Sequence, residues 1–132
     1  MRDPRPPLLL TRPEPQAGRF AAEMRSRFGG DWPVVIAPIL RIEPVAADLP
    51  AADWRVFTSE NAVAAHGAGC GPAYCVGERT AVAARAAGFE VVVTEPDAAR
   101  LIPRLIALRP ARRGLVLRGR HAAAEIAERL NS

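Results

Sequence analysis

Small hydroxyl and glycine residues follow three short apolar runs, at points where a helix is expected to begin. The junctions read V-F-T-S-E-N-A-V (56–63), Y-C-V-G-E-R-T-A (74–81) and L-L-L-T-R-P-E (8–14). If the strands are parallel, these junctions share the carboxyl edge of a sheet, where free backbone N–H groups at helix N-termini bind anions. The pattern predicts a site that binds and positions an acidic ligand, with candidate residues Thr11, Arg12, Thr58, Ser59, Asn61, Gly77 and, after a later apolar run, Arg118.

Residues that act as nucleophiles, metal ligands or phosphate clamps do not occur in familiar patterns. The Gly-rich stretch 67–71 lacks dinucleotide-binding spacing, and the absence of lysine excludes a Walker loop. Ser59 lacks the G-x-S-x-G elbow of a hydrolase. Cys70 and Cys75 form no C-x-x-C pair, and Cys75 is expected to be a reduced, buried thiol. Neither a metal nor a cofactor is predicted.

Composition narrows the class of protein and of ligand. The chain has 132 residues, of which 49% are hydrophobic, so it is expected to be globular, with one domain or slightly more. Its net charge of +4 comes from scattered arginines rather than from a dense basic stripe, which argues against nucleic-acid binding. Arginine pairs well with carboxylates, so a small acidic substrate is favoured. With no run long enough for a signal peptide or a membrane span, the protein is predicted to be cytoplasmic, without membrane contact.

Hydrophobic periodicity predicts alternating strands and helices. Helices are expected at 15–28, 59–66, 78–87, 97–108 and 121–130, the fourth with a cap at Asp97 and a kink or break near Pro103. Strands are expected at 8–11, 34–37, 55–58, 73–76, 90–94 and 114–118, with a half-exposed strand at 39–43. This alternation indicates right-handed βαβ units, so the predicted fold class is α/β with a parallel sheet.

The same elements predict two domains of unequal size. Residues 38–132 are expected to form a flavodoxin-like α/β domain that lacks its last strand. Residues 1–37 supply only a strand, a helix and a strand, which cannot bury enough surface to be stable alone. We therefore expect 1–37 to be part of an incomplete first domain.

Six segments in order resemble the uroporphyrinogen-III synthase family. They are the opening L-L-L-T-R-P-E, then I-L-R-I-E-P (39–44), F-T-S-E-N-A-V (57–63), C-V-G-E-R-T-A (75–81), A-G-F-E-V (87–91) and L-V-L-R-G (115–119). Members of that family have two α/β domains joined by a two-stranded ladder, and the first domain combines the N-terminal segment with the C-terminal half. Because family chains are about twice as long, the resemblance implies that this chain is truncated at its C-terminus.

The resemblance also implies a reaction. The family converts hydroxymethylbilane, a linear tetrapyrrole with acetate and propionate arms, into uroporphyrinogen III for haem biosynthesis, losing water and inverting the last pyrrole ring. It needs no cofactor, and the full-length enzyme is expected to be a monomer. Thr80 matches the family's threonine near the substrate and is the candidate for binding the leaving hydroxyl. The protein's task is then positioning and charge placement rather than acid–base chemistry.

Structural roles compete with these functional ones. Ser59 is equally suited to cap the following helix, and Thr58 and Asn61 can bond to nearby backbone. Arg12 can be a solvated surface charge. Two alternatives stay open for the whole chain: a non-catalytic α/β domain that binds a small polyanion, and a swapped homodimer in which two copies cover each other's sheet edges.

Overall fold

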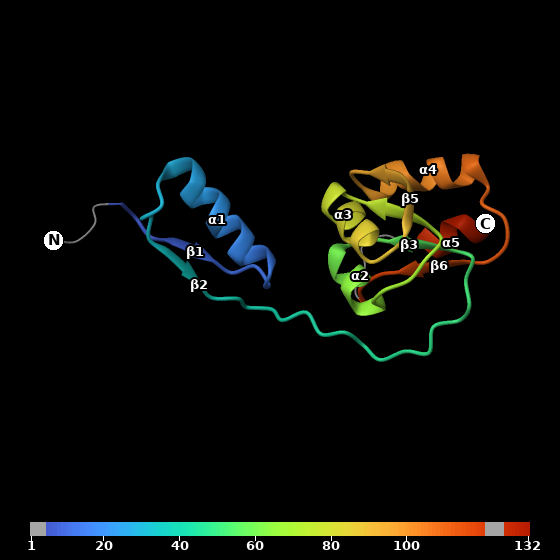
Figure 1. Cartoon of the computed structure of the whole chain (residues 1–132), viewed down its shortest axis with the longest axis horizontal. Helices are drawn as coiled ribbons and strands as arrows, with labels where there is room; N and C mark the ends of the chain where they lie inside the picture. Colours follow the sequence, from blue (N-terminus) through green and yellow to red (C-terminus); the bar gives the residue numbers. More distant parts are fainter. Residues whose placement is uncertain (1–4, 121–125) are drawn as a thin grey trace. The chain divides into compact units, whose positions relative to one another are not determined.

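The computed structural model describes residues 5–120 and 126–132. Strands and helices alternate in it, except that two strands follow each other across residues 37–53 (Figure 1). The chain divides into two compact units, Met1–Pro44 and Val45–Ser132, which are called unit 1 and unit 2 below. Every strand pairing in the described residues is parallel. The predicted α/β fold class is therefore confirmed, while the assignment of residues 1–37 to an incomplete larger domain stays a prediction.

Unit 1 is a two-stranded parallel sheet with one helix. Strand β1 (Leu8–Leu10) pairs with β2 (Val34–Ile36), and helix α1 (Gln16–Phe28) connects them. The buried core consists of Leu10, Ala17 and Ala21, with Leu8 and Val34 packed against it. Gly29 ends α1 at a φ of +130°, a conformation that favours glycine.

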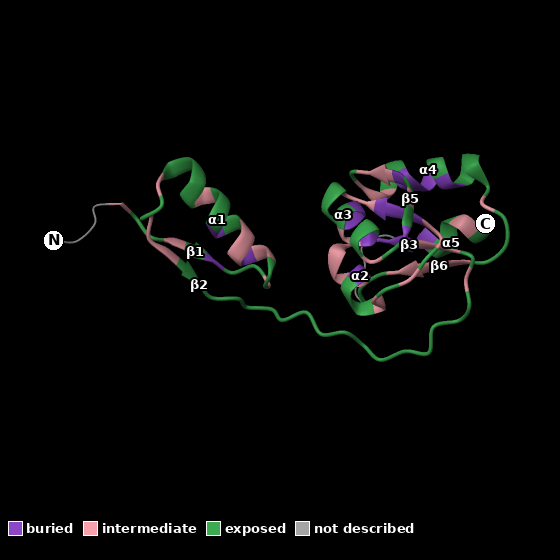
Figure 2. Ribbon diagram, viewed as in Figure 1, coloured by how far each residue is buried: buried purple, intermediate pink, exposed green. Residues whose placement is uncertain are grey.

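The segment after β2 contains no strand, so the predicted strand at 39–43 is wrong. Residues 37–53 carry no regular element, and Figure 2 shows most of this segment as exposed. Ile39 and Leu40 are 76% and 65% exposed. The alternation of apolar and charged residues is present, but a strand also needs a neighbour that pairs its backbone N–H and C=O groups. Among the described residues, no strand pairs with this segment.

Unit 2 is built on a four-stranded parallel sheet. Its strands are β3 (Trp54–Phe57), β4 (Pro72–Val76), β5 (Glu90–Glu95) and β6 (Gly114–Leu117), in the spatial order β5-β4-β3-β6. Numbered within the unit, this order is 3-2-1-4, which begins the Rossmann-type order and differs from the 2-1-3-4-5 order of flavodoxin. The likeness to flavodoxin thus holds for the parallel α/β arrangement and not for the strand order.

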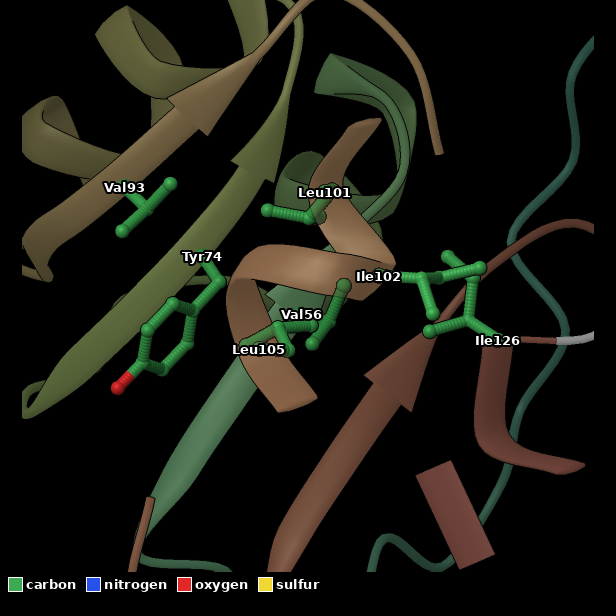
Figure 3. Close-up of a cluster of buried hydrophobic side chains, with 7 residues drawn as sticks. All are labelled: Val56, Tyr74, Val93, Leu101, Ile102, Leu105 and Ile126. Carbon is green, nitrogen blue, oxygen red and sulfur yellow. The ribbon is translucent and has the colours of Figure 1, made fainter. Parts of the chain in front are cut away.

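Helices cover both faces of this sheet because alternate strand residues point to opposite sides. On one face, Phe57 and Cys75 pack against α2 (Glu60–His66) and α3 (Glu78–Ala86). On the other face lie α4 (Ala98–Leu108) and α5 (Ile126–Asn131). Figure 3 shows that second core, whose buried members are Val56, Tyr74, Val93, Leu101, Ile102, Leu105 and Ile126.

Helix ends in unit 2 follow local sequence signals. Ser59 caps α2, and Asp97 caps α4 as predicted. Helix α4 is not broken at Pro103. The N–H that Pro103 lacks would have paired with the carbonyl of Ala99, an exposed residue where water can replace it. For the last predicted helix, residues 121–125 lie outside the described residues, and α5 runs from Ile126 to Asn131.

Candidate functional site

The candidate site lies at the carboxyl edge of the unit 2 sheet. Phe57 is in register with both Cys75 and Leu117, so the residues that follow these three positions lie along one edge. Strands β4 and β5, which follow β3 in the chain, lie on one side of β3, whereas β6 lies on its other side. The strand order therefore reverses between β3 and β6. Ligands of open α/β sheets bind at such a reversal. Thr58 and Arg118 follow the two strands that flank it.

Thr58 closes the sheet at this reversal. Its backbone N–H and its Oγ1 both donate to the carbonyl oxygen of Leu117, at 3.2 and 3.1 Å. The hydroxyl proton is thus engaged, and Thr58 offers only an acceptor oxygen to a ligand. Thr58 therefore bonds to backbone, as its structural alternative required, but the partner lies 59 positions away rather than nearby in the sequence.

Ser59 has a free proton beside its capping role. The residue is extended (φ −159°), and its Oγ accepts a hydrogen bond from the backbone N–H of Ala62 at 3.2 Å. Among the described residues the hydroxyl proton has no acceptor, so the same side chain can cap α2 and donate to a carboxylate. Asn61, also half-buried, lies in the first turn of the same helix.

Gly77 makes the turn from β4 into α3 and leaves the start of that helix open. Its φ is +86°, and its N–H donates to the carbonyl of Glu95 at 2.8 Å. Because glycine has no side chain, α3 has no side-chain cap. The N–H groups of its first turn therefore stay available at the carboxyl edge.

Thr80 combines burial with an unpaired hydroxyl. It is 4% exposed, and in the described part of the chain its hydroxyl makes no hydrogen bond. A Cβ at Gly77 would stand 3.9 Å from Thr80 Oγ1, which places the hydroxyl beside the open turn. A hydroxyl that makes no bond within the protein can donate to a ligand at this turn without losing a protein contact.

Charged residues at the edge include one pair that the sequence analysis missed. Glu95, the last residue of β5, bonds to Arg104 of α4 at 2.7 Å, and its side chain is 19% exposed. The arginine neutralises a carboxylate that would otherwise repel an anion. Arg118 is exposed and donates to the carbonyl of Gly119 at 3.3 Å, adding positive charge near the strand reversal.

Thr11 and Arg12 occupy the corresponding position in unit 1. They follow β1, both are exposed, and the carbonyl of Thr11 accepts a hydrogen bond from the N–H of Ile39 at 3.2 Å. The structure thus brings six candidates together on one sheet edge and places these two in the other unit. The six are Thr58, Ser59, Asn61, Gly77, Thr80 and Arg118.

Other kinds of chemistry find no support in the described residues. No group of His, Cys, Asp or Glu there is arranged to hold a metal ion. Cys75 is fully buried, and burial raises the pKa of its thiol to about 11, so it stays protonated and unreactive at neutral pH. Across residues 5–120 and 126–132 no helix has the length and apolar character that a membrane crossing requires.

Comparison with known proteins identifies the family of the chain. The family model for uroporphyrinogen-III synthase HemD matches residues 20–132, which include all of unit 2. No curated protein matches the chain. Since the family match spans most of the sequence and contains the six grouped candidates, the chain belongs to the uroporphyrinogen-III synthase family.

Proposed function

We propose that this protein acts on hydroxymethylbilane as a uroporphyrinogen-III synthase, a lyase of tetrapyrrole biosynthesis. The observation that carries the proposal is Thr80, a residue that is only 4% exposed and whose hydroxyl, unpaired within the described residues, lies beside the uncapped first turn of α3. An enzyme of this family handles a substrate with many carboxylates and one departing hydroxyl. The edge of unit 2 offers donors suited to both.

The chemistry requires positioning more than proton transfer. With a proton taken from the solvent, the terminal hydroxyl departs as water and leaves an azafulvene cation, which the substituted carbon of the last pyrrole attacks to form a spiro intermediate. Its reopening and reclosure invert that ring. The final ring closure returns a proton to the solvent, so the net change is the loss of one water. A hydrogen bond from Thr80 to the departing oxygen stabilises the charge that develops there, and the closing step needs no oxidant or reductant.

Substrate affinity must come from many contacts. Each carboxylate at a helix N-terminus gains about 0.3–1 kcal/mol, whereas micromolar binding requires about 8 kcal/mol. The open N–H groups of α3 and the hydroxyl of Ser59 supply the weaker contacts in this proposal. Arg118 supplies arginine pairing with a carboxylate, which adds to these contacts.

The test is to give hydroxymethylbilane to the purified chain and to resolve isomers III and I of the product. We expect isomer III, formed roughly tenfold more slowly by Thr80→Val, because one charge-assisted hydrogen bond is lost. Thr94→Val, which makes the same change on β5, should leave the rate unchanged. Isomer I alone, from a folded chain, would contradict the proposed activity.

A binding measurement separates the synthase from the non-catalytic alternative. Uroporphyrin III carries the same acetate and propionate arms and does not react. Its affinity therefore measures binding at the carboxyl edge without any contribution from the reaction. Binding that Thr80→Val or Arg118→Gln weakens, without formation of isomer III, would support a polyanion-binding domain.

A further inference from the structure

A cavity lies at the amino edge of the unit 2 sheet, opposite the carboxyl edge described above. Its lining includes Trp54 and Gly114, the first residues of β3 and β6. With four residues in each of these strands, about 13 Å of sheet separates this edge from the carboxyl edge. The cavity volume is about 920 Å³, which is large enough for a small molecule.

The walls of this cavity combine apolar and cationic residues. Leu105 of α4, Leu115 of β6 and Leu130 of α5 form an apolar surface. Among the described residues, no acidic residue lines the cavity, whereas four arginines do: Arg109, Arg112, Arg113 and Arg129. Such a mixture suits a ligand with an apolar body and a negative head group.

Trp54 shapes the cavity wall and leaves a donor unpaired. A Cβ at Gly114 would stand 2.2 Å from the Trp54 ring, so only glycine lets the indole lie over this strand start. The ring also packs edge-on against Tyr74, with centroids 5.7 Å apart. Its Nε1 is buried and has no hydrogen-bond partner in the described residues. The ring of Trp54 therefore forms a fixed apolar part of the cavity wall.

The arginines at the cavity are largely uncompensated. Arg112 faces Asp53 at 3.7 Å, but within residues 5–120 and 126–132 the side chains of Arg109 and Arg129 form no ion pair. The C-termini of α4 and α5 contribute at most about half a negative charge each, less than the arginines supply. Arg109 and Arg112 also have φ values of +46° and +71°, a region that disfavours residues with a side chain.

We propose that this cavity binds a small carboxylate with an apolar body. The guanidiniums of Arg109 and Arg129 pair with the carboxylate, since the planar fork of arginine matches its two oxygens. The apolar body lies against the leucines and the ring of Trp54. This site is separate from the carboxyl edge and does not depend on the proposed synthase activity.

Octanoate, titrated into the full chain by calorimetry, tests the proposal. We expect saturable binding of octanoate and none of octylammonium, which has the same tail and the opposite charge. The double variant Arg109→Gln/Arg129→Gln should bind octanoate at least about tenfold more weakly, because charge-assisted hydrogen bonds are lost. The control Arg41→Gln/Arg100→Gln removes two exposed arginines outside the cavity and should retain the affinity.

Fluorescence locates the ligand. In Trp32→Phe the remaining tryptophan is Trp54, so octanoate should change the emission with the same midpoint as the calorimetric titration. If that variant fails to fold, paramagnetic or chemical-shift effects on the indole N–H of Trp54 in the native chain give the same information. Equal binding of octylammonium, equal loss in the control variant, or a silent Trp54 would each overturn the proposal.

Discussion

Three hydroxyl groups at the carboxyl edge of unit 2 differ in what their protons do. Thr58 donates to Leu117, Ser59 accepts from the start of α2 and keeps its proton free, and Thr80 makes no bond within the described residues. A hydroxyl whose proton is engaged cannot donate to a carboxylate without first losing a protein contact. Substrate contact is therefore expected most at Thr80, then at Ser59, and least at Thr58.

The buried thiol of Cys75 should make the free energy of unfolding depend on pH in the alkaline range. Burial raises its pKa from 9.0 to about 11, so the folded state holds the thiol proton more tightly than the unfolded state. The stabilising effect is complete below about pH 9 and is lost as pH rises to about 11, amounting to roughly 3 kcal/mol. Urea unfolding of Cys75→Ala should show a weaker decline over this range than the native chain.

The control for this prediction is the other cysteine. Cys70 is exposed, so Cys70→Ala should retain the full alkaline decline. Burial also raises the pKa of Tyr74, which adds to the decline in all three proteins alike. If Cys75→Ala loses stability with pH as steeply as the native chain, the thiol is not the source.

Residue-level roles were predictable where they depend on neighbours in sequence. The capping of α2 by Ser59 and the turn at Gly77 follow from a few adjacent residues. The bond from Thr58 to Leu117 joins residues 59 positions apart, so no local pattern could indicate it. The pairing of Glu95 with Arg104 was missed because it depends on how α4 packs beside β5.

At the scale of elements, the N-cap of α4 should contribute measurably to stability, because this helix contains a proline. Asp97 accepts from the backbone N–H of Arg100 at 2.8 Å and pairs with its guanidinium. Asp97→Ala should lower the free energy of unfolding by about 1 kcal/mol, because an N–H of the first turn loses its partner. Denaturant unfolding measures this change.

Asparagine at the same position separates the cap from the charge. Asp97→Asn keeps an acceptor oxygen, and the ion pair with Arg100 is exposed, so this variant should lose only a few tenths of a kcal/mol. A loss as large as that of alanine would show that the charge, rather than the cap, stabilises α4.

Strand prediction succeeded where burial accompanied the apolar pattern. The strands of unit 2 are apolar runs that pair on at least one side and pack beneath helices. Residues 39–43 show a clear alternation, yet Ile39 and Leu40 remain exposed. Periodicity describes which face of a strand is apolar, whereas the existence of the strand depends on a partner that the pattern does not contain.

For the molecule as a whole, the two units differ in how they are stabilised. Unit 2 has two buried clusters, one on each face of its sheet, which include large side chains such as Phe57 and Leu101. Among its described residues, unit 1 buries only Leu10 and two alanines, and it leaves Leu9 and Val35 60% and 51% exposed. Two strands with one helix rarely bury enough surface to offset the entropy lost on folding.

We therefore expect residues 45–132 to fold as an isolated fragment and residues 1–44 to remain unfolded. Circular dichroism should show a cooperative thermal transition for the larger fragment, because both of its core clusters are intact. The smaller fragment should show no transition at low concentration. In the full chain, hydrogen exchange should be slow at Val56 and Cys75 and fast at Leu9, since protection follows local stability. A cooperative transition in dilute 1–44 would contradict this account, whereas folding of 1–44 only at high concentration would indicate that its exposed apolar residues are covered by a second copy.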